Sequence, residues 1–185
     1  MPLDELGERL REHALLEGDF VLRSGRRSSY YLDKYRFETR PELLGPLGER
    51  LAAAVREHEP EAVRLAGPAL GAVALAASAS LASGLPFVIV RPEAKEYGTA
   101  NRLEGPFVEG ELVCLLEDVV TSGGALAEAV TALREAGLVV RNAVCVVDRE
   151  EGGADALARL GVRLRALYRA GDLVPAGKSA GNPHR

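Results

Sequence analysis

Tryptophan is absent from this sequence, and cysteine, histidine and long apolar runs are scarce. The two cysteines, Cys114 and Cys145, lie inside apolar segments that are typical of buried strands. We therefore expect two core thiols in a reducing compartment such as the cytoplasm, and no disulfide framework. The three histidines, His13, His58 and His184, have no acidic or cysteine partner at metal-ligand spacing. No Ser/His/Asp or Cys/His pattern indicates a nucleophilic enzyme.

Short apolar runs and a negative charge argue against membrane and nucleic-acid partners. The longest apolar stretch, around residues 69–77, is far shorter than the roughly 18–20 residues that a membrane span needs. Residues 3–13 carry too many charges for a signal peptide. The formal net charge of -4 disfavours a general nucleic-acid surface, so a polyanionic substrate must meet local cations or a metal ion.

The chain is long enough for one domain with a sizeable core, at 185 residues and 47% hydrophobic. Its periodicity predicts strands near residues 62–66, 87–91, 112–116, 139–147 and 162–167, and helices near 2–16, 41–58, 72–83, 125–136 and 153–160. This alternation is typical of an α/β fold with a central, mostly parallel sheet and helices on both faces.

We expect three regions within this single domain. Residues 1–40 form a small N-terminal hood, residues 41–175 the α/β core, and residues 176–185 a polar tail. In the hood, Gly18 is expected to end the first helix, and two short β runs within residues 20–33 flank a turn at Ser24-Gly25.

Residues 111–130, ELVCLLEDVVTSGGALAEAV, carry the densest chemistry. Glu117 and Asp118 follow a buried apolar run, and a small-residue turn from Thr121 to Gly124 precedes a helix. The N–H groups of such a turn and the helix dipole favour an anion, and the carboxylates can accept hydrogen bonds from ribose hydroxyls. The pattern indicates a phosphorylated sugar; the alternative is an ordinary strand–turn–helix with solvated acids. No lysine follows the glycines, and no G-x-G-x-x-G spacing is present.

Two more loops follow predicted strands at the same edge of the sheet. The glycines of residues 67–71 allow backbone amides to approach pyrophosphate oxygens. The long loop of residues 92–106 begins directly after Arg91, a candidate static anchor. This loop holds Lys95, a candidate mobile cation. Such a loop is typical of a lid that excludes water, and the alternative is a solvated insertion.

Aromatic and basic residues suggest a site for a planar base. A basic, hydroxyl-rich run, RSGRRSSYY, ends in Tyr30 and Tyr31, which can stack on a ring, and Arg149 can pair with a substrate carboxylate. The alternatives are an exposed hairpin for the run and a simple salt bridge of Arg149 with Glu150 or Glu151.

Four segments together resemble a known family. The run VCLL-ED-VV-TSGG resembles the phosphoribosyl-diphosphate (PRPP) motif of type I phosphoribosyltransferases. Within that fold, GDFVLRSGRRSSYYLD is similar to the hood of orotate phosphoribosyltransferases, RPEAKEYG to their mobile catalytic loop, and VVDREEGG to their orotate-contacting region. The resemblance spans about residues 15–153 and implies transfer of phosphoribose from PRPP to orotate, giving orotidine 5′-monophosphate and diphosphate.

The resemblance also implies a set of site residues, a cofactor and an assembly. Lys95 and Asp118 match catalytic positions. The matches to PRPP-binding positions are Arg91, Lys95, Glu117, Asp118, Val119, Val120, Thr121, Ser122, Gly123, Gly124 and Ala125. The matches to orotate-binding positions are Arg23, Tyr30, Tyr31, Thr121 and Arg149. The implied cofactor is Mg²⁺ bridged by PRPP, with Glu117 and Asp118 reaching it through water and no direct protein ligand. The implied assembly is a homodimer whose mobile loop acts on the neighbouring subunit's site.

The chain departs from the family pattern at three positions. Pro92 stands where many members have a second basic residue, Tyr97 where many have histidine, and residues 67–71 lack a lysine found in many relatives. Two rival functions stay open: a purine-type phosphoribosyltransferase, and a PRPP-sensing regulator that binds nucleic acid. The aromatic pair and Arg149 disfavour the first, because a neutral purine needs no carboxylate partner; the lack of a basic face disfavours the second.

The resemblance makes Lys95 the most direct target for mutation. Lys95→Ala should lower kcat by a large factor while the fold survives, because the loop cation that neutralises the leaving diphosphate is lost. Steady-state kinetics with PRPP and orotate, alongside a thermal melt, test this. Near-wild-type turnover in a folded Lys95→Ala protein would remove the lid-lysine hypothesis.

Overall fold

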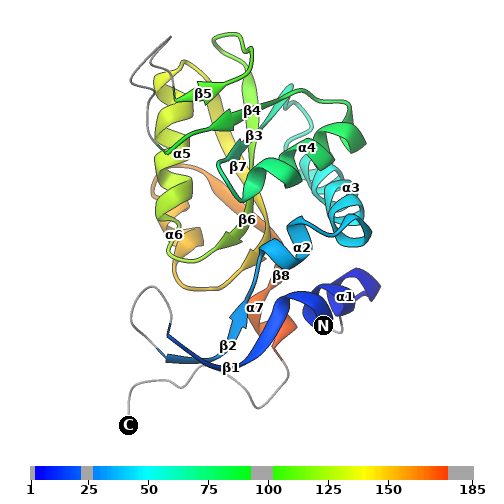
Figure 1. Ribbon diagram of the computed structural model, residues 1–185. Helices are drawn as coiled ribbons and strands as arrows, with labels where there is room; N and C mark the ends of the chain where they lie inside the picture. Colours follow the sequence, from blue (N-terminus) through cyan, green and yellow to red (C-terminus); the bar gives the residue numbers. More distant parts are fainter. Residues whose placement is uncertain (1–2, 22–26, 93–101, 175–185) are drawn as a thin grey trace.

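Within residues 3–21, 27–92 and 102–174, which this computed structural model describes, six strands form one central sheet (Figure 1). The strands are β3 (Arg64–Pro68), β4 (Phe87–Val90), β5 (Leu103–Glu104), β6 (Leu112–Val120), β7 (Val139–Asp148) and β8 (Arg163–Arg169). Their order is β5-β4-β3-β6-β7-β8; β5 pairs antiparallel with β4, and the other pairs are parallel. The predicted α/β fold with a mostly parallel sheet is confirmed.

Helices cover both faces of this sheet (Figure 1). α3 (Pro41–His58) and α4 (Ala72–Ser83) lie on one face, and α5 (Gly124–Glu135) and α6 (Gly153–Ala158) lie on the other. Side chains alternate along β6, so Leu116 packs into the cluster with α3 and α4, whereas Leu115 packs into the cluster with α5. Each face of the sheet therefore has its own apolar core.

The N-terminal segment lies beyond the carboxyl end of β6 (Figure 1). It consists of α1 (Glu5–Ala14), an antiparallel hairpin of β1 (Leu15–Val21) and β2 (Arg27–Leu32), and α2 (Tyr35–Glu38). α7 (Ala170–Leu173) follows β8 and lies beside α1. The expected turn at Ser24-Gly25 and tail at residues 176–185 lie outside the described residues.

Several predicted boundaries were wrong. Helix α1 ends at Ala14, and Gly18 lies inside β1, because Leu15 already pairs with Leu32 of the hairpin. Strand β6 continues to Val120 rather than ending at residue 116, because it pairs with β7 as far as Asp148. The short elements α2, β5 and α7 were not predicted, since each is too brief to show a period.

Other predictions were confirmed. Cys114 and Cys145 are free thiols in buried strands. Pro41 opens α3, and α4 spans residues 72–83 as expected.

Among the helices that the structure describes, none is long and apolar enough to cross a membrane.

Helices α3 and α4 approach each other closely at Gly48. A Cβ atom at this position would lie 2.1 Å from the Ser78 side-chain oxygen and 2.8 Å from the Ser78 carbonyl carbon. The Ser78 hydroxyl in turn donates to the Leu44 carbonyl at 2.9 Å, which holds it in place. The absence of a side chain at residue 48 therefore sets the spacing of the two helices.

Gly48→Ala should destabilise the protein by about 1–3 kcal/mol, because the added methyl group meets backbone atoms that cannot move aside. At roughly 2–4 °C per kcal/mol, calorimetry should detect the lower Tm. Glu49→Ala, at the exposed neighbouring position, is the control and should stay within about 0.5 kcal/mol of wild type. Equal melting of both variants would contradict this account of the helix contact.

Candidate functional site

An open cleft lies where the carboxyl end of β6 meets the start of α5 and the hairpin. Its empty volume, which is open to solvent, is about 1820 Å³. It gathers most of the residues predicted for the site: Tyr31, Glu117, Val119, Val120, Thr121, Ser122, Gly123, Gly124, Ala125 and Arg149. Val21, Pro92, Leu126, Glu128 and Glu151 complete its described lining. Four parts of the sequence therefore meet at one surface: the hairpin, Pro92 beyond β4, the β6–α5 segment, and the residues after β7.

The floor of this cleft is the turn before α5. Gly123 is the N-cap and adopts φ 81°, and a Cβ atom there would come within 3.0 Å of the Gly153 Cα atom. Only glycine satisfies both constraints without strain. No side chain caps α5, and its first turn holds no acidic residue. Its first N–H groups are therefore left to an anion, as at a phosphate site.

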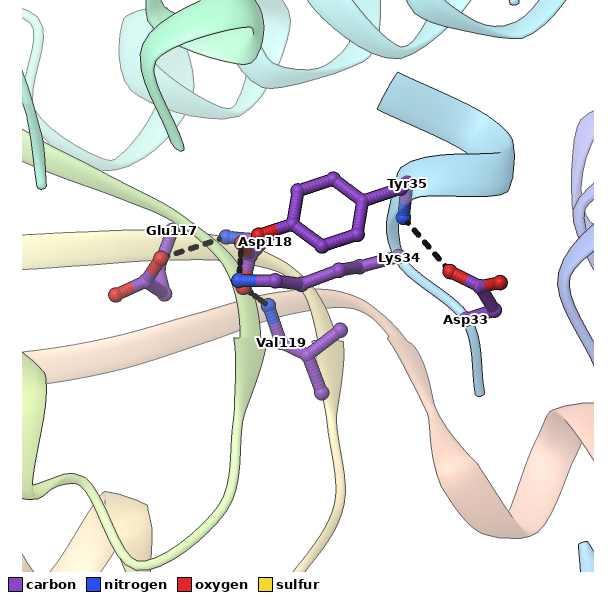
Figure 2. Close-up of polar contacts among 6 residues, drawn as sticks. All are labelled: Asp33, Lys34, Tyr35, Glu117, Asp118 and Val119. Atoms are coloured by element: carbon purple, nitrogen blue, oxygen red, sulfur yellow. Dashed lines mark hydrogen bonds and ion pairs between the residues drawn. The ribbon is translucent and has the colours of Figure 1, made fainter. Parts of the chain in front are cut away.

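Glu117 and Asp118 are adjacent on β6, but their side chains lie in different environments (Figure 2). Glu117 lines the cleft, whereas Asp118 is not among the described residues that do so. Asp118 Oδ2 instead accepts a hydrogen bond from Lys34 Nζ at 2.6 Å, and Asp118 Oδ1 accepts one from the Val119 N–H. Residues in a strand alternate between its faces, so the two side chains leave β6 in different directions. The expectation that both carboxylates meet one sugar stays a prediction.

Burial shifts the pKa values of the side chains around Asp118, namely Lys34, Glu38 and Glu117. Burial, followed by the negative charge of Asp118, raises the pKa of both Glu117 and Glu38. For Lys34, burial alone would lower the pKa, but the hydrogen bond and charge of Asp118 outweigh it and raise the pKa overall. The cluster therefore keeps a charged ammonium, and protons on buried carboxyl groups are stabilised.

Arg149 lies on the hairpin side of the cleft. Its guanidinium carbon is 5.9 Å from the centroid of the Tyr30 ring, and its Nη2 atom is 3.0 Å from Glu151 Oε1. The alternative of a salt bridge with Glu151 is thus observed. The Arg149 Nε atom is buried without a hydrogen-bond partner in the described part of the chain, so this side chain retains an unused donor.

Other predicted residues lie elsewhere or outside the description. Arg91 Nη1 is 3.2 Å from Glu104 Oε1, and Arg91 is not among the described residues that line the cleft. Arg23, Lys95 and Tyr97 lie outside the described residues. Their predicted roles stay predictions.

Sequence analysis missed Lys34 and Glu38. The scarcity of lysine, with three in the chain, was the one sequence feature that singled out Lys34. Its contact with Asp118 could not be foreseen, because the two residues are 84 positions apart.

Over residues 3–21, 27–92 and 102–174, no group of three or more His, Cys, Asp or Glu side chains is arranged to hold a metal ion.

Glu38 gives a test of this electrostatic arrangement. Its pKa rises from 4.5 to about 8 through burial and the charge of Asp118, so the folded state holds a proton that the unfolded state releases. Stability should therefore fall as pH rises from about 4.5 to about 8. Glu38→Gln removes the part of this decline that Glu38 causes, while the part due to Glu117 remains. The Tm of Glu38→Gln should therefore exceed that of wild type increasingly across the window, by at least about 2–4 °C at the upper end.

Melting curves between pH 4.5 and 8 measure this difference. Glu57→Gln, which removes a carboxylate whose side chain is 74% exposed, is the matched control and should follow the wild-type curve. A constant offset between Glu38→Gln and wild type at every pH would show that the Glu38 carboxyl does not titrate in this range.

Known proteins place this fold and cleft in context. No family model matches the sequence. The chain is 49% identical, over 94% of its length and 97% of the relative's, to the orotate phosphoribosyltransferase of Halobacterium salinarum. The crystal structure of orotate phosphoribosyltransferase from Aeropyrum pernix is similar, with 35% identity, a TM-score of 0.81, and coverage of 91% of this chain and 95% of that one.

A further solved structure carries a ligand. It is the Mycobacterium tuberculosis orotate phosphoribosyltransferase in complex with PRPP, 29% identical, with a TM-score of 0.77 and coverage of 91% of this chain and 96% of that one. High identity over nearly the whole chain, together with the shared fold, shows that the chain belongs to the orotate phosphoribosyltransferase family of pentosyltransferases.

Proposed function

We propose that this chain transfers the phosphoribosyl group of PRPP to orotate, giving orotidine 5′-monophosphate and diphosphate in pyrimidine biosynthesis. The observation that carries the proposal is the shared cleft of an uncapped α5 N-terminus, the Glu117 carboxyl and the Arg149 guanidinium. These groups suit a phosphate, ribose hydroxyls and an anionic base, in that order. The related enzyme crystallised with PRPP supports the same substrate.

PRPP would bind along the end of β6. The turn of Thr121 to Gly124 would hold the 5′-phosphate with its N–H groups and hydroxyls. Glu117 would accept hydrogen bonds from the ribose, beside the backbone of Val119, Val120 and Ala125. Arg91 and Lys95 are the proposed cations for the diphosphate, as the family resemblance implies.

Orotate would bind on the hairpin side. Arg149 would exchange its Glu151 partner for the orotate carboxylate, using the donor at Nε that has no described partner. Tyr30, which already lies against Arg149, and Tyr31 would flank the ring, with Arg23 and Thr121 as further contacts. A neutral purine would leave the arginine without this gain, which favours orotate over adenine, hypoxanthine or xanthine.

In the reaction, the C1′–O bond to diphosphate breaks and the diphosphate leaves with the electron pair. Orotate would bind as the dianion that has already lost its N1 proton to solvent, and the N1 electron pair forms the new bond to C1′, so the chain need supply no general base. The chain's part is to align the two substrates and to neutralise the departing charge.

Magnesium is a proposed cofactor. Glu117 brings a carboxyl group to the cleft, and carboxyl oxygens suit this hard cation. When bound with PRPP, the ion supplies positive charge to the leaving diphosphate. Since the described residues offer no cluster of three ligands, PRPP oxygens and water would supply most of its coordination.

A homodimer is proposed for the assembly, with the loop after Arg91 acting on the neighbouring site. Exposed apolar side chains support a partner surface near α4: Leu81 is 89% exposed, Leu70 is 73% exposed and Tyr35 of α2 is 48% exposed. Such side chains gain stability when a second subunit covers them.

The function is tested by a panel of bases with the wild-type protein. Orotate absorbance should fall only when PRPP and Mg²⁺ are both present, and adenine, hypoxanthine and xanthine should release no diphosphate at comparable rates. Preferential use of a purine would overturn the assignment of the base. Retention on DNA or RNA, with no turnover of any base, would instead favour a PRPP-sensing regulator.

A further inference from the structure

Lys34 connects the hairpin to the central sheet. It follows β2 closely in the sequence, and its ammonium lies 2.6 Å from Asp118 Oδ2 (Figure 2). The Asp118 side chain is 3% exposed, but the Lys34 side chain is 34% exposed. The ammonium therefore stands at the boundary between a buried carboxylate and solvent, where a ligand can reach it.

The Lys34–Asp118 pair lies directly against Gly71. A Cβ atom built on Gly71 would lie 2.5 Å from Lys34 Nζ and 1.7 Å from Asp118 Oδ2. The Lys34–Asp118 pair thus occupies the space in which a side chain at residue 71 would begin. Gly71 is also the N-cap of α4, which has no side-chain cap and no acidic residue in its first turn. Cationic and N–H groups therefore converge beside the loop of residues 67–71.

The Lys34–Asp118 pair lies where the order of the strands in the sheet changes direction, between β3 and β6. Strands β3 and β6 are parallel neighbours, but β3 leads through α4 to β4 on one side, and β6 leads through α5 to β7 on the other. α4 and α5 lie on opposite faces of the sheet (Figure 1), so the loops after β3 and β6 lead away from each other. Open α/β sheets generally bind ligands at such a point. Lys34 Nζ lies beside both Gly71 of the first loop and Asp118 of β6.

The loop after β3, Gly67-Pro68-Ala69-Leu70-Gly71, carries no charged side chain of its own. We propose that Lys34 is the diphosphate-binding cation at this loop: Asp118 holds its ammonium in the free protein, and the ammonium moves to a diphosphate oxygen when PRPP binds. The Asp118 carboxylate is then released to accept hydrogen bonds from ribose hydroxyls. This inference rests on the proposed function.

The exchange is balanced in charge. Asp118 gives up one charge-assisted hydrogen bond and gains hydroxyl donors, while the ammonium exchanges a carboxylate oxygen for a phosphate oxygen of similar strength. Lysine suits this step, because its ammonium is a compact charge on a flexible four-carbon stem. No proton or covalent bond needs to move.

The test compares three ligands by calorimetric titration: PRPP, inorganic diphosphate and ribose 5-phosphate, all with Mg²⁺. Lys34→Met should weaken PRPP and diphosphate about 10- to 100-fold, the loss expected for one charge-assisted hydrogen bond. Ribose 5-phosphate lacks the diphosphate, so its Kd should change by less than about 3-fold. Lys34→Arg should recover most of the lost affinity, because the positive charge is kept.

Arg36→Met is the matched control. It removes a cation two residues further along α2, where the side chain is 51% exposed and pairs with Asp33. All three Kd values should match wild type. An equal loss of PRPP and ribose 5-phosphate in Lys34→Met would mean that Lys34 only holds Asp118 in place, and an unchanged Kd for PRPP would exclude any role in binding it.

A crystal of the wild-type protein with PRPP and Mg²⁺ tests the proposal without a variant. The Lys34 ammonium should lie within hydrogen-bond distance of a diphosphate oxygen, and its continued pairing with Asp118 alone would overturn the proposal. Orotate turnover, measured in solution on the same protein preparations, distinguishes failure of the Lys34 proposal from failure of the proposed function. Normal turnover with unaltered PRPP affinity in Lys34→Met refutes only the role of Lys34. PRPP binding through Lys34 without orotate turnover refutes only the proposed function.

Discussion

Strand β6 carries two adjacent carboxyl groups into the interior, and its pleat turns them to opposite faces of the sheet. Glu117 joins the face of α5 and the cleft, and Asp118 joins the face of α4. Both side chains lose most of their hydration, so each needs a proton, a cation or hydrogen bonds in compensation. For Asp118 the compensation is Lys34, and that contact joins the hairpin to the sheet.

The same principle explains the hairpin side of the cleft. Arg149 is largely buried, and its charge is balanced by Glu151 and by the face of the Tyr30 ring. Its backbone N–H donates to the Val120 carbonyl at 2.8 Å, which fixes the arginine relative to the end of β6. An anionic base that replaces Glu151 keeps this balance, whereas a neutral base does not. The proposed selectivity for an anionic base would therefore depend on Arg149, a side chain anchored next to the turn of Thr121 to Gly124.

The sequence predicted the features whose chemistry lies in consecutive residues. The acids, the turn and the start of α5 occupy residues 117–125, and their spacing alone indicated a phosphorylated sugar. Features that depend on the path of the chain were not predictable. Lys34 meets Asp118 across 84 residues, and the division of the two acids between faces required β6 to continue to Val120. Gly18 was misassigned because pairing with β2 outweighs the usual role of glycine at a helix end.

Two ion pairs at opposite ends of β3 and β6 show how the choice of cation fits its task. At the amino ends, Arg64 contacts Glu111 through two nitrogen atoms, at 2.7 and 3.0 Å, and this fork fixes the register of the strands. At the carboxyl ends, Lys34 contacts Asp118 through one ammonium. A buried ion pair adds little net stability, because desolvation offsets much of the attraction. The Lys34 contact compensates Asp118 through one ammonium on a flexible stem, which suits the proposed exchange of Asp118 for a ligand oxygen better than a rigid fork would.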